Sequence, residues 1–326
     1  KFGIYSTPWR GTYEGHIGSS ADNENGAYEW IDAGDHNEFY RISKDDKTRD
    51  RKKRANWKIG QVSFGEKDAA QWAAWGVDYL KYDWFPNDVP HVEAMAEALL
   101  KSGRDVVFSL SNTALYDSAA DYARLANAWR TTGDIRDTWE SMSRIGFAQD
   151  RWAGYTGPGH WSDPDMLVVG QVGWGPNLHL TKLTPDEQYT HISLWCLLSA
   201  PLLIGCDIAQ MDDFTLGLLT NDEVIELDQD PLGRQATQIR NDGDKVVYAK
   251  KLEDGSTAIG LFNRGSSETA ISVTWGPWSD LPTAEKTNRL VRDLWRQKDL
   301  GQFDGKFEAK VAPHGVVLVR LSGAND

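Results

Sequence analysis

The chain has 326 residues, enough for a large hydrophobic core and more than one domain. Its formal net charge of −13 and pI near 5.0 argue against a polyanionic partner, because phosphate backbones are bound by clustered lysine and arginine. No apolar run approaches the roughly 20 residues that a membrane helix needs. We therefore expect neither nucleic acid nor a membrane as a partner, and composition leaves the oligomeric state open.

Residues up to Asp207 alternate between helical and strand-like patterns. About sixty polar residues follow the first strand, which favours a lid or an insertion, and the basic run Lys47–Arg54 within them is expected to be a solvated loop. The predicted strands are Lys1–Ser6, Asp78–Asp83, Asp105–Leu110, Trp129–Asp134, Gly159–Leu167 and Pro201–Asp207. The predicted helices are Lys67–Trp75, His91–Ser102, Ala119–Ala128, Thr138–Ile145 and Tyr189–Ser199.

Each of these strands ends in polar groups, and a parallel βα barrel brings such ends together. A full barrel has eight strands, so two strands either lack a recognisable pattern or precede Lys1. Beyond Gly233 the pattern changes to short alternating or β-branched runs, which predict an antiparallel β-sandwich. These runs are Lys245–Lys251, Thr257–Asn263, Thr269–Trp275, Arg289–Gln297 and Lys306–Leu321. We thus expect a catalytic barrel domain over residues 1–235 and a sandwich domain over residues 236–326.

Tryptophan is unusually common, and twelve of the 15 tryptophans precede residue 236. Aromatic faces form cores, but they also pack against neutral sugar rings, so the excess favours a carbohydrate site. The only two cysteines, Cys196 and Cys206, are expected to be buried thiols, since a disulfide framework would need more of them.

Two carboxylates at strand ends suggest an acid and a base. Side chains two apart on a strand share a face, so Lys81 points with Asp83 while Tyr82 points away. By the same count Arg130 and Asp134 share a face. Trp161, Asp163 and Asp165 form a third such set.

A cation beside a carboxylate favours the ionised form that a nucleophile needs. Two carboxylates facing a pocket with a tryptophan wall suit glycoside hydrolysis. Metal catalysis is the weaker interpretation, because His160 is out of phase with the carboxylates and no HExxH or CxxC motif occurs.

Each of these residues also has a plainer interpretation. Asp83 or Asp134, taken singly, is more often a strand-end cap or an ion-pair partner, and Asp163–Asp165 alone indicates a turn. Trp129 and Trp161 alone are ordinary core residues. The recurrence of polar groups at the same phase of successive strands favours the joint hypothesis.

Five motifs in order resemble glycoside hydrolase family 27, the retaining α-galactosidases and α-N-acetylgalactosaminidases. They are YLKYD, WRTTGDI, GPGHWSDPDMLVVG, APLLIGCDI and NDEVIELDQDPLGRQ. The resemblance implies that Asp83 is the nucleophile and Asp134 the general acid/base, about 5 to 5.5 Å apart in a retaining enzyme. It also implies sugar contacts from Tyr5, Lys81, Arg130 and Asp165, and from neighbouring positions Trp84, Ser111, Ala114, Trp129 and Trp161.

The chain departs from the family pattern in three places. Family members have two βα units before the strand resembling Gly3–Ser6, the second ending in an acidic pair, so we expect an N-terminally incomplete barrel. Trp84-Phe85-Pro86 follows the YLKYD motif in place of a cysteine-containing turn, which predicts an aromatic ledge beside the nucleophile. Ser111 and Ala114 stand where α-galactosidases have a glutamate and a bulky residue, and small residues there resemble the N-acetylgalactosaminidase type.

We therefore expect a retaining α-glycosidase, α-galactosidase-like, that needs no metal and no organic cofactor. α-N-acetylgalactosaminidase, β-L-arabinopyranosidase and isomaltose-type activities are alternatives within the family, and a non-catalytic carbohydrate-binding protein is an alternative outside it. The resemblance also suggests a secreted or periplasmic protein.

Overall fold

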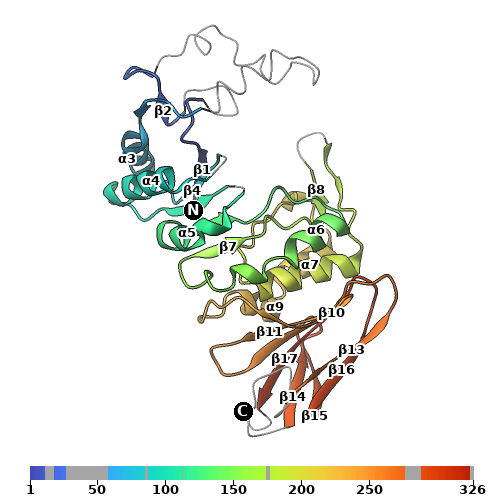
Figure 1. The fold of residues 1–326 in the computed structure, drawn as a ribbon. Helices are drawn as coiled ribbons and strands as arrows, with labels where there is room; N and C mark the ends of the chain where they lie inside the picture. The colour runs from blue at the N-terminus through green and yellow to red at the C-terminus, as the bar shows by residue number, and fades with distance from the viewer. Residues whose placement is uncertain are drawn as a thin grey trace. The chain divides into compact units, whose positions relative to one another are not determined.

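The computed structural model describes residues 1–11, 18–26, 58–84, 87–111, 113–173, 177–275 and 288–323 (Figure 1). The chain forms two compact units, Lys1–Gly133 and Asp134–Asp326, and each is described by itself. The basic run Lys47–Arg54 and the residues Phe85 and Pro86 lie outside the described residues. The boundary near residue 236 stays a prediction.

The first unit contains four parallel strands in the order β1 (Gly3–Ser6), β4 (Tyr79–Tyr82), β5 (Val107–Leu110) and β6 (Ala128–Arg130). Tyr5 pairs with Lys81, which pairs with Ser109, and Leu110 pairs with Trp129. Leu80 and Leu110 are fully buried, which is expected of a parallel sheet covered by helices.

Helices connect these strands, as the alternating pattern predicts. They are α3 (Gly65–Trp75), α4 (Val89–Lys101), the 3₁₀ turn Tyr116–Ser118 and α5 (Ala119–Leu125). Helix α3 ends at Gly76 with a φ of 79°, where the absence of a Cβ permits the left-handed conformation. The hairpin β2 (Ser20–Ala21) and β3 (Val62–Ser63) lies in the segment between β1 and α3.

The second unit begins with α6 (Trp139–Gly146), the 3₁₀ turn Asp150–Trp152 and the strands β7 (Trp161–Asp163), β8 (Gln171–Val172) and β9 (His179–Leu180). Helices α7 (Pro185–Leu197), α8 (Asp213–Thr220) and α9 (Asp222–Asp228) follow, with a 3₁₀ turn at Ile208–Gln210 before α8. Thr184 and Glu187 form a reciprocal capping box at the start of α7, confirming the predicted N-terminus. The predicted strand Pro201–Asp207 is an extended segment whose Ile204 forms one parallel bridge with Leu167.

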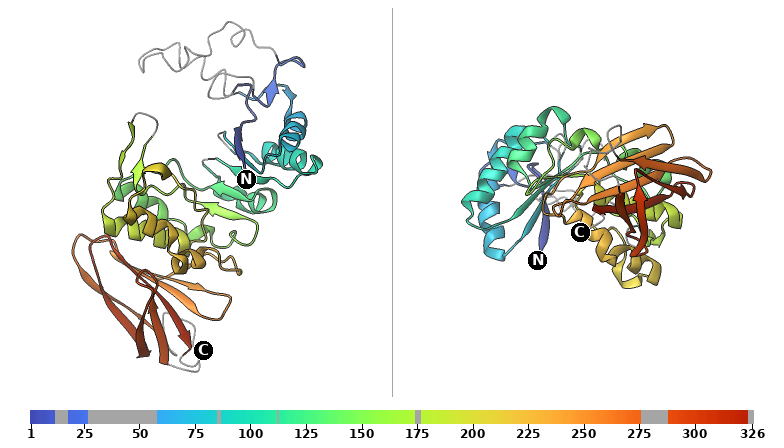
Figure 2. Two further views of the ribbon diagram at one scale, coloured as in Figure 1. Left: turned by 180° about the vertical axis from the view of Figure 1, so that it is seen from behind. Right: turned by 90° about the horizontal axis from the view of Figure 1, so that it is seen from below.

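The sandwich strands are β10 (Thr237–Asp242), β11 (Lys245–Lys251), β12 (Thr257–Asn263), β13 (Thr269–Thr274), β14 (Asn288–Asp293), β15 (Lys298–Asp304), β16 (Lys306–Val311) and β17 (Val316–Gly323). Six of them form one antiparallel sheet in the order β10-β11-β12-β17-β14-β15, and β13 pairs with β16. These strands are the orange to red arrows in Figure 2. The sequence predicted β11 and β12 at their observed ends, but missed β10 and β15 and merged β16 with β17.

Helix α7 packs against the sandwich as well as against α6 and α9. Ten of its 13 residues are buried, among them Leu194, Trp195 and Leu197, and each large apolar side chain contributes roughly 1.5–3 kcal/mol by leaving water. The Thr190 hydroxyl donates to the His314 carbonyl at 2.7 Å. The His314 ring lies 2.6 Å from a Glu187 carboxylate oxygen and stacks on Trp139 at 4.1 Å between centroids.

A buried lysine joins α7 and α9 to β11. Lys250 is 1% exposed, and its ammonium donates to the Ser199 hydroxyl at 2.7 Å and to the Cys196 carbonyl at 3.2 Å, and also to the Leu227 carbonyl. Burial lowers the pKa of Lys250 to about 8, while the charge of Asp228 acts in the opposite direction. This group therefore ties three elements of the second unit together.

Both cysteines are free thiols; Cys196 is buried as predicted and Cys206 is half-buried. Burial raises the pKa of both thiols. Among the described residues, no helix combines the length and the apolar character needed to cross a bilayer.

Candidate active site

Lys81 and Asp83 lie at the carboxyl end of β4, in the first unit. Both are half-buried, whereas Leu80, Tyr82 and Trp84 between and beside them are buried, so the chain alternates as the two-residue repeat predicts. The Asp83 amide donates to the Ser6 carbonyl of β1 at 2.7 Å. This bond continues the pairing of β1 with β4 as far as Asp83, the first residue after β4.

The loop after β5 lies beside this position. The Ser111 amide donates to the Tyr82 carbonyl at 3.0 Å, and the Ala114 amide donates to the Arg130 carbonyl at 2.8 Å. Ser111, Ala114 and Arg130 are each at most 5% exposed. Since all these residues are at the carboxyl ends of adjoining parallel strands, the first unit gathers five of the predicted sugar-binding or catalytic residues along one edge.

Two residues that the sequence motifs do not mark hold the β5 loop. The Asn87 carboxamide donates to the Ser111 carbonyl, and the Tyr122 hydroxyl donates to the Asn87 carbonyl at 2.6 Å. The Leu115 amide donates in turn to the Tyr122 hydroxyl at 3.4 Å. No local motif signals these contacts, because they join residues that are 24 and 35 positions apart.

The structure places two predicted sugar contacts in the core instead. Trp84 is 1% exposed and packs edge-on against Tyr82 at 4.6 Å, so it adds almost no exposed surface to the predicted aromatic ledge, whose other two residues lie outside the described ones. Trp129 is fully buried, with its ring 6.4 Å from that of Tyr122 on α5. Trp129 pairs with Leu110 and so shares its buried face, and the alternation along β6 puts Arg130 on the opposite face. Tyr5, in contrast, is 67% exposed on β1.

In the second unit, Asp134 is exposed, and a hydrogen bond to Asp165 holds the backbone of the next residue, Ile135. The Ile135 amide donates to Asp165 Oδ2 at 2.8 Å, and the Met166 amide donates to Asp165 Oδ1 at 2.7 Å. Asp165 is 2% exposed. Its carboxylate therefore positions the backbone beside Asp134, although the resemblance implies a sugar contact for it.

The predicted common face of Trp161, Asp163 and Asp165 ends at Asp163. Strand β7 stops there, and Asp165 has a φ of 91°, which turns its side chain out of the two-residue repeat. The Asp165 amide donates to Asp163 Oδ1 at 2.7 Å. The half-buried Trp161 lies against the turn at Gly233, where an added Cβ would come within 2.7 Å of the indole.

Helix α7 supports Asp165 through two aromatic side chains. Trp195 Nε1 donates to the Asp165 carbonyl at 2.7 Å, and the His191 ring stands edge-on to Trp195 at 4.1 Å. The Val168 amide donates to His191 Nε2 at 3.0 Å. Complete burial lowers the pKa of His191 to about 3, so the imidazole is neutral and can accept this bond at physiological pH.

A titratable group also lies near the buried face of β4. Burial raises the pKa of Asp68 on α3 to about 6, and a hydrogen bond with Ser19 acts in the opposite direction. Burial, followed by the charges of Asp68 and Asp88, raises the pKa of Tyr82. Within the described ranges, no three His, Cys, Asp or Glu side chains come together as a metal site.

Two family models match this chain. The model described as "Alpha galactosidase A" matches residues 51–230, and that described as "Alpha galactosidase C-terminal beta sandwich domain" matches residues 242–321. The chain belongs to the α-galactosidase family, glycoside hydrolase family 27. Membership confirms the barrel-plus-sandwich fold class and the resemblance that the five motifs carry.

Curated relatives of the family are similar over most of the chain. "Alpha-galactosidase 2" of Arabidopsis thaliana is 40% identical over 267 residues, which are 81% of this chain and 64% of the relative. "Probable alpha-galactosidase" of Dictyostelium discoideum is 35% identical over 277 residues, 82% of this chain and 69% of the relative. The chain spans 61–64% of the length of three plant relatives from Arabidopsis thaliana, Cyamopsis tetragonoloba and Oryza sativa.

Solved structures of the family show the same architecture. A GH27 β-L-arabinopyranosidase from Geobacillus stearothermophilus has a TM-score of 0.79 and 28% identity, with 99% of this chain and 74% of that chain covered. The α-galactosidase I from Mortierella vinacea has a TM-score of 0.73 and 26% identity, with 98% and 76% covered.

Proposed function

We propose that the chain is a retaining α-glycosidase that acts on terminal α-galactosyl residues, with Asp83 as nucleophile and Asp134 as general acid/base. The observation that carries the proposal is the carboxyl edge of the first unit, where Lys81, Asp83, Ser111 and Arg130 are aligned by strand register and backbone hydrogen bonds. The names of the similar curated relatives support the same activity.

The proposed reaction has two displacements. A carboxylate oxygen of Asp83 forms a bond to the anomeric carbon while the bond to the leaving oxygen breaks, and Asp134 donates the proton that this oxygen takes. Water then attacks the anomeric carbon, Asp134 accepts its proton, and the bond to Asp83 breaks. Two inversions leave the configuration unchanged.

Variants of the two carboxylates test their roles. Asp83→Ala should lower kcat for nitrophenyl α-galactoside by about 10⁴-fold or more, because no covalent intermediate can form. Asp134→Ala should lose less activity on this substrate than on an alkyl galactoside, because nitrophenolate leaves with little help from an acid. Azide should restore some turnover to Asp134→Ala by attacking the glycosyl-enzyme.

Asp105→Ala is the matched control, since Asp105 is an exposed carboxylate at the opposite end of the neighbouring strand. It should keep wild-type rates, and circular dichroism should show all variants folded. Equal turnover by wild type and folded Asp83→Ala would reject the enzyme and favour a carbohydrate-binding protein.

Small side chains in the β5 loop favour a second candidate, α-N-acetylgalactosaminidase. Ser111 and Ala114 leave more room than a glutamate and a bulky residue would, and Asn87 holds the loop in place. Comparing kcat/KM for the nitrophenyl α-galactoside, α-N-acetylgalactosaminide and β-L-arabinopyranoside separates the activities. Preference for the N-acetylated sugar would replace the first candidate with the second.

A further inference from the structure

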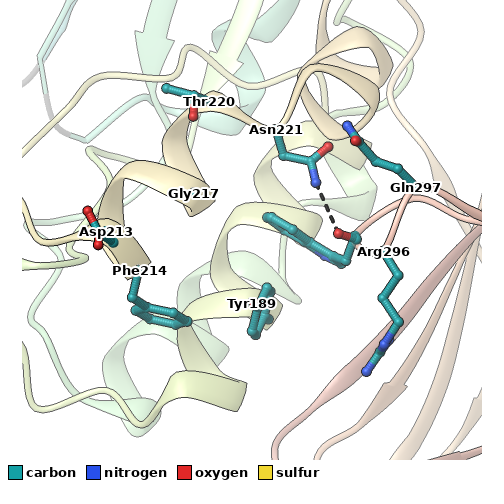
Figure 3. A pocket seen from close by; sticks show the side chains of 9 residues that line it. Tyr189, Asp213, Phe214, Gly217, Thr220, Asn221, Arg296 and Gln297 are labelled. Atoms are coloured by element: carbon teal, nitrogen blue, oxygen red, sulfur yellow. Dashed lines mark hydrogen bonds between the residues drawn. The ribbon is translucent and has the colours of Figure 1, made fainter.

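The second unit has a hollow of about 500 Å³ that shares no residue with the candidate active site (Figure 3). Its walls come from three places that are distant in sequence: Tyr189 on α7, the segment from Asp213 to Asn221 on and after α8, and the turn that joins β14 to β15. The volume is in the range of small-molecule sites.

Three aromatic side chains line this hollow. The Tyr189 ring lies 5.6 Å from Phe214 at 84° between planes, and 4.7 Å from Trp295 at 77°. All three are half-buried and pack on the hydrophobic core below. Each ring therefore keeps part of its surface exposed at the hollow, and the C–H face of a pyranose ring can pack against such a surface.

Polar groups of both signs surround the aromatic patch. Asp213 and Arg296 are exposed, and Arg296 pairs with Asp293 on the strand before it. Asp213 is the first residue of α8. Together with Gln297 these side chains offer acceptors and donors for hydroxyl groups, and the mixed charge favours a neutral ligand.

Hydrogen bonds fix the hollow before any ligand binds. Asn221 Nδ2 donates to the Leu294 and Trp295 carbonyls, both at 3.3 Å, and Trp295 Nε1 donates to Ser193 Oγ at 2.8 Å. Gln297 Nε2 donates a hydrogen bond to the Asp222 carboxylate at the start of α9. Because the aromatic rings are already ordered, binding a ligand costs little conformational entropy.

We propose that this hollow is a non-catalytic binding site for one pyranose unit of a neutral oligo- or polysaccharide. The choice of a neutral saccharide rests on the proposed function, in which the substrate is a galactose-containing saccharide. A purely aliphatic ligand would make no hydrogen bond with the polar groups at the rim, whereas sugar hydroxyl groups can.

Indole N–H resonances of the full chain labelled with ¹⁵N-tryptophan test the proposal. The experiment uses Asp83→Ala protein to prevent hydrolysis, galactose and melibiose as probes, and Trp295→Phe to assign the signal. We expect the Trp295 signal to shift saturably with either sugar, and Phe214→Ala to weaken this binding roughly tenfold or more. Leu216→Ala is the control, because Leu216 is exposed on the same helix and does not line the hollow.

Asp213→Ala is a second variant that alters only an exposed side chain, and we expect it to weaken binding severalfold while the protein stays folded. An unmoved Trp295 signal at saturating sugar would overturn the proposal. So would unchanged binding by both Phe214→Ala and Asp213→Ala, or an equal shift caused by phenol, which would indicate an apolar site of another class.

The assay distinguishes this site from the proposed activity. Phe214→Ala in the otherwise wild-type chain should hydrolyse nitrophenyl α-galactoside at the wild-type rate. If the Trp295 signal shifts saturably but the wild-type chain hydrolyses no galactoside, the sugar site in the hollow is supported and the glycosidase activity is rejected. If the wild-type chain hydrolyses galactosides but the Trp295 signal does not shift, the activity is supported and the sugar site is rejected.

Discussion

Replacing Asp165 by asparagine tests whether this residue positions the proposed acid/base. The carboxylate accepts hydrogen bonds from the Ile135 and Met166 amides, one on each oxygen. Asparagine keeps the shape and tolerates the φ of 91° better than alanine would, but it offers one acceptor in place of two. One buried amide must then face an NH₂ group.

The expected magnitude follows from these two bonds. A hydrogen bond to a charged acceptor contributes about 1.5–3 kcal/mol, and an unpaired buried amide adds a desolvation cost. We expect Asp165→Asn to lower the free energy of unfolding by about 2–3 kcal/mol. Displacement of Ile135 would move Asp134, and small misplacements of catalytic groups cost up to about 10²-fold in rate.

Kinetics with two leaving groups separates positioning from stability. Asp165→Asn should lower kcat for melibiose about 10- to 100-fold with little change in KM, and should affect nitrophenyl α-galactoside less, because that substrate needs less protonation. Asp186→Asn, an isosteric change at an exposed carboxylate, is the control.

Equal losses on both substrates would show that Asp165 contributes only to stability. Wild-type kinetics in the variant would refute the positioning role altogether.

Two further predictions concern stability. Lys250→Met should lower the free energy of unfolding by about 3 kcal/mol, because it leaves buried carbonyls and Asp228 without the ammonium. In urea unfolding, the control Lys251→Met on the same strand should stay within about 0.5 kcal/mol of the wild type. Equal urea midpoints for the two variants would contradict this prediction. Asp68 binds a proton more tightly folded than unfolded, so its ionisation destabilises the protein as pH rises from about 4 to about 6, and that loss persists at higher pH. Asp68→Asn should therefore be more stable than wild type at pH 7 by about 1–2 kcal/mol, after discounting for solvent, with the difference vanishing near pH 4; a difference independent of pH would contradict the assignment.

The two-residue repeat predicts much of what the structure contains. It places Lys81 and Asp83 on the face opposite Tyr82, and the same count places Trp84 with Tyr82 in the core. The alternation therefore assigns Trp84 to the core and not to the predicted sugar contacts. The repeat failed at Asp165, since a positive φ cannot be read from an Asp-Pro-Asp sequence alone.

Elements without an apolar stripe were the hardest to predict. Strands β10 and β15 are the edges of the six-stranded sheet, where a single neighbour and exposed side chains permit polar sequences such as KDLGQFD. Contacts such as Asn87 with Ser111 depend on the assembled fold, and no sequence pattern signals them.

The burial of α7 on both of its sides has a consequence for how the protein folds and evolves. Because α7 packs on the sandwich as well as on other helices, its packing is complete only once the sandwich sheet has formed. The backbone amides of α7 should therefore exchange hydrogen with solvent at rates similar to those of β11, β12 and β17. A chain ending near residue 235 would expose the apolar face of α7 that the sandwich covers, and such a chain should aggregate. Substitutions in α7 should consequently covary with substitutions in the sandwich strands, even though the sequence pattern changes beyond Gly233, between these elements.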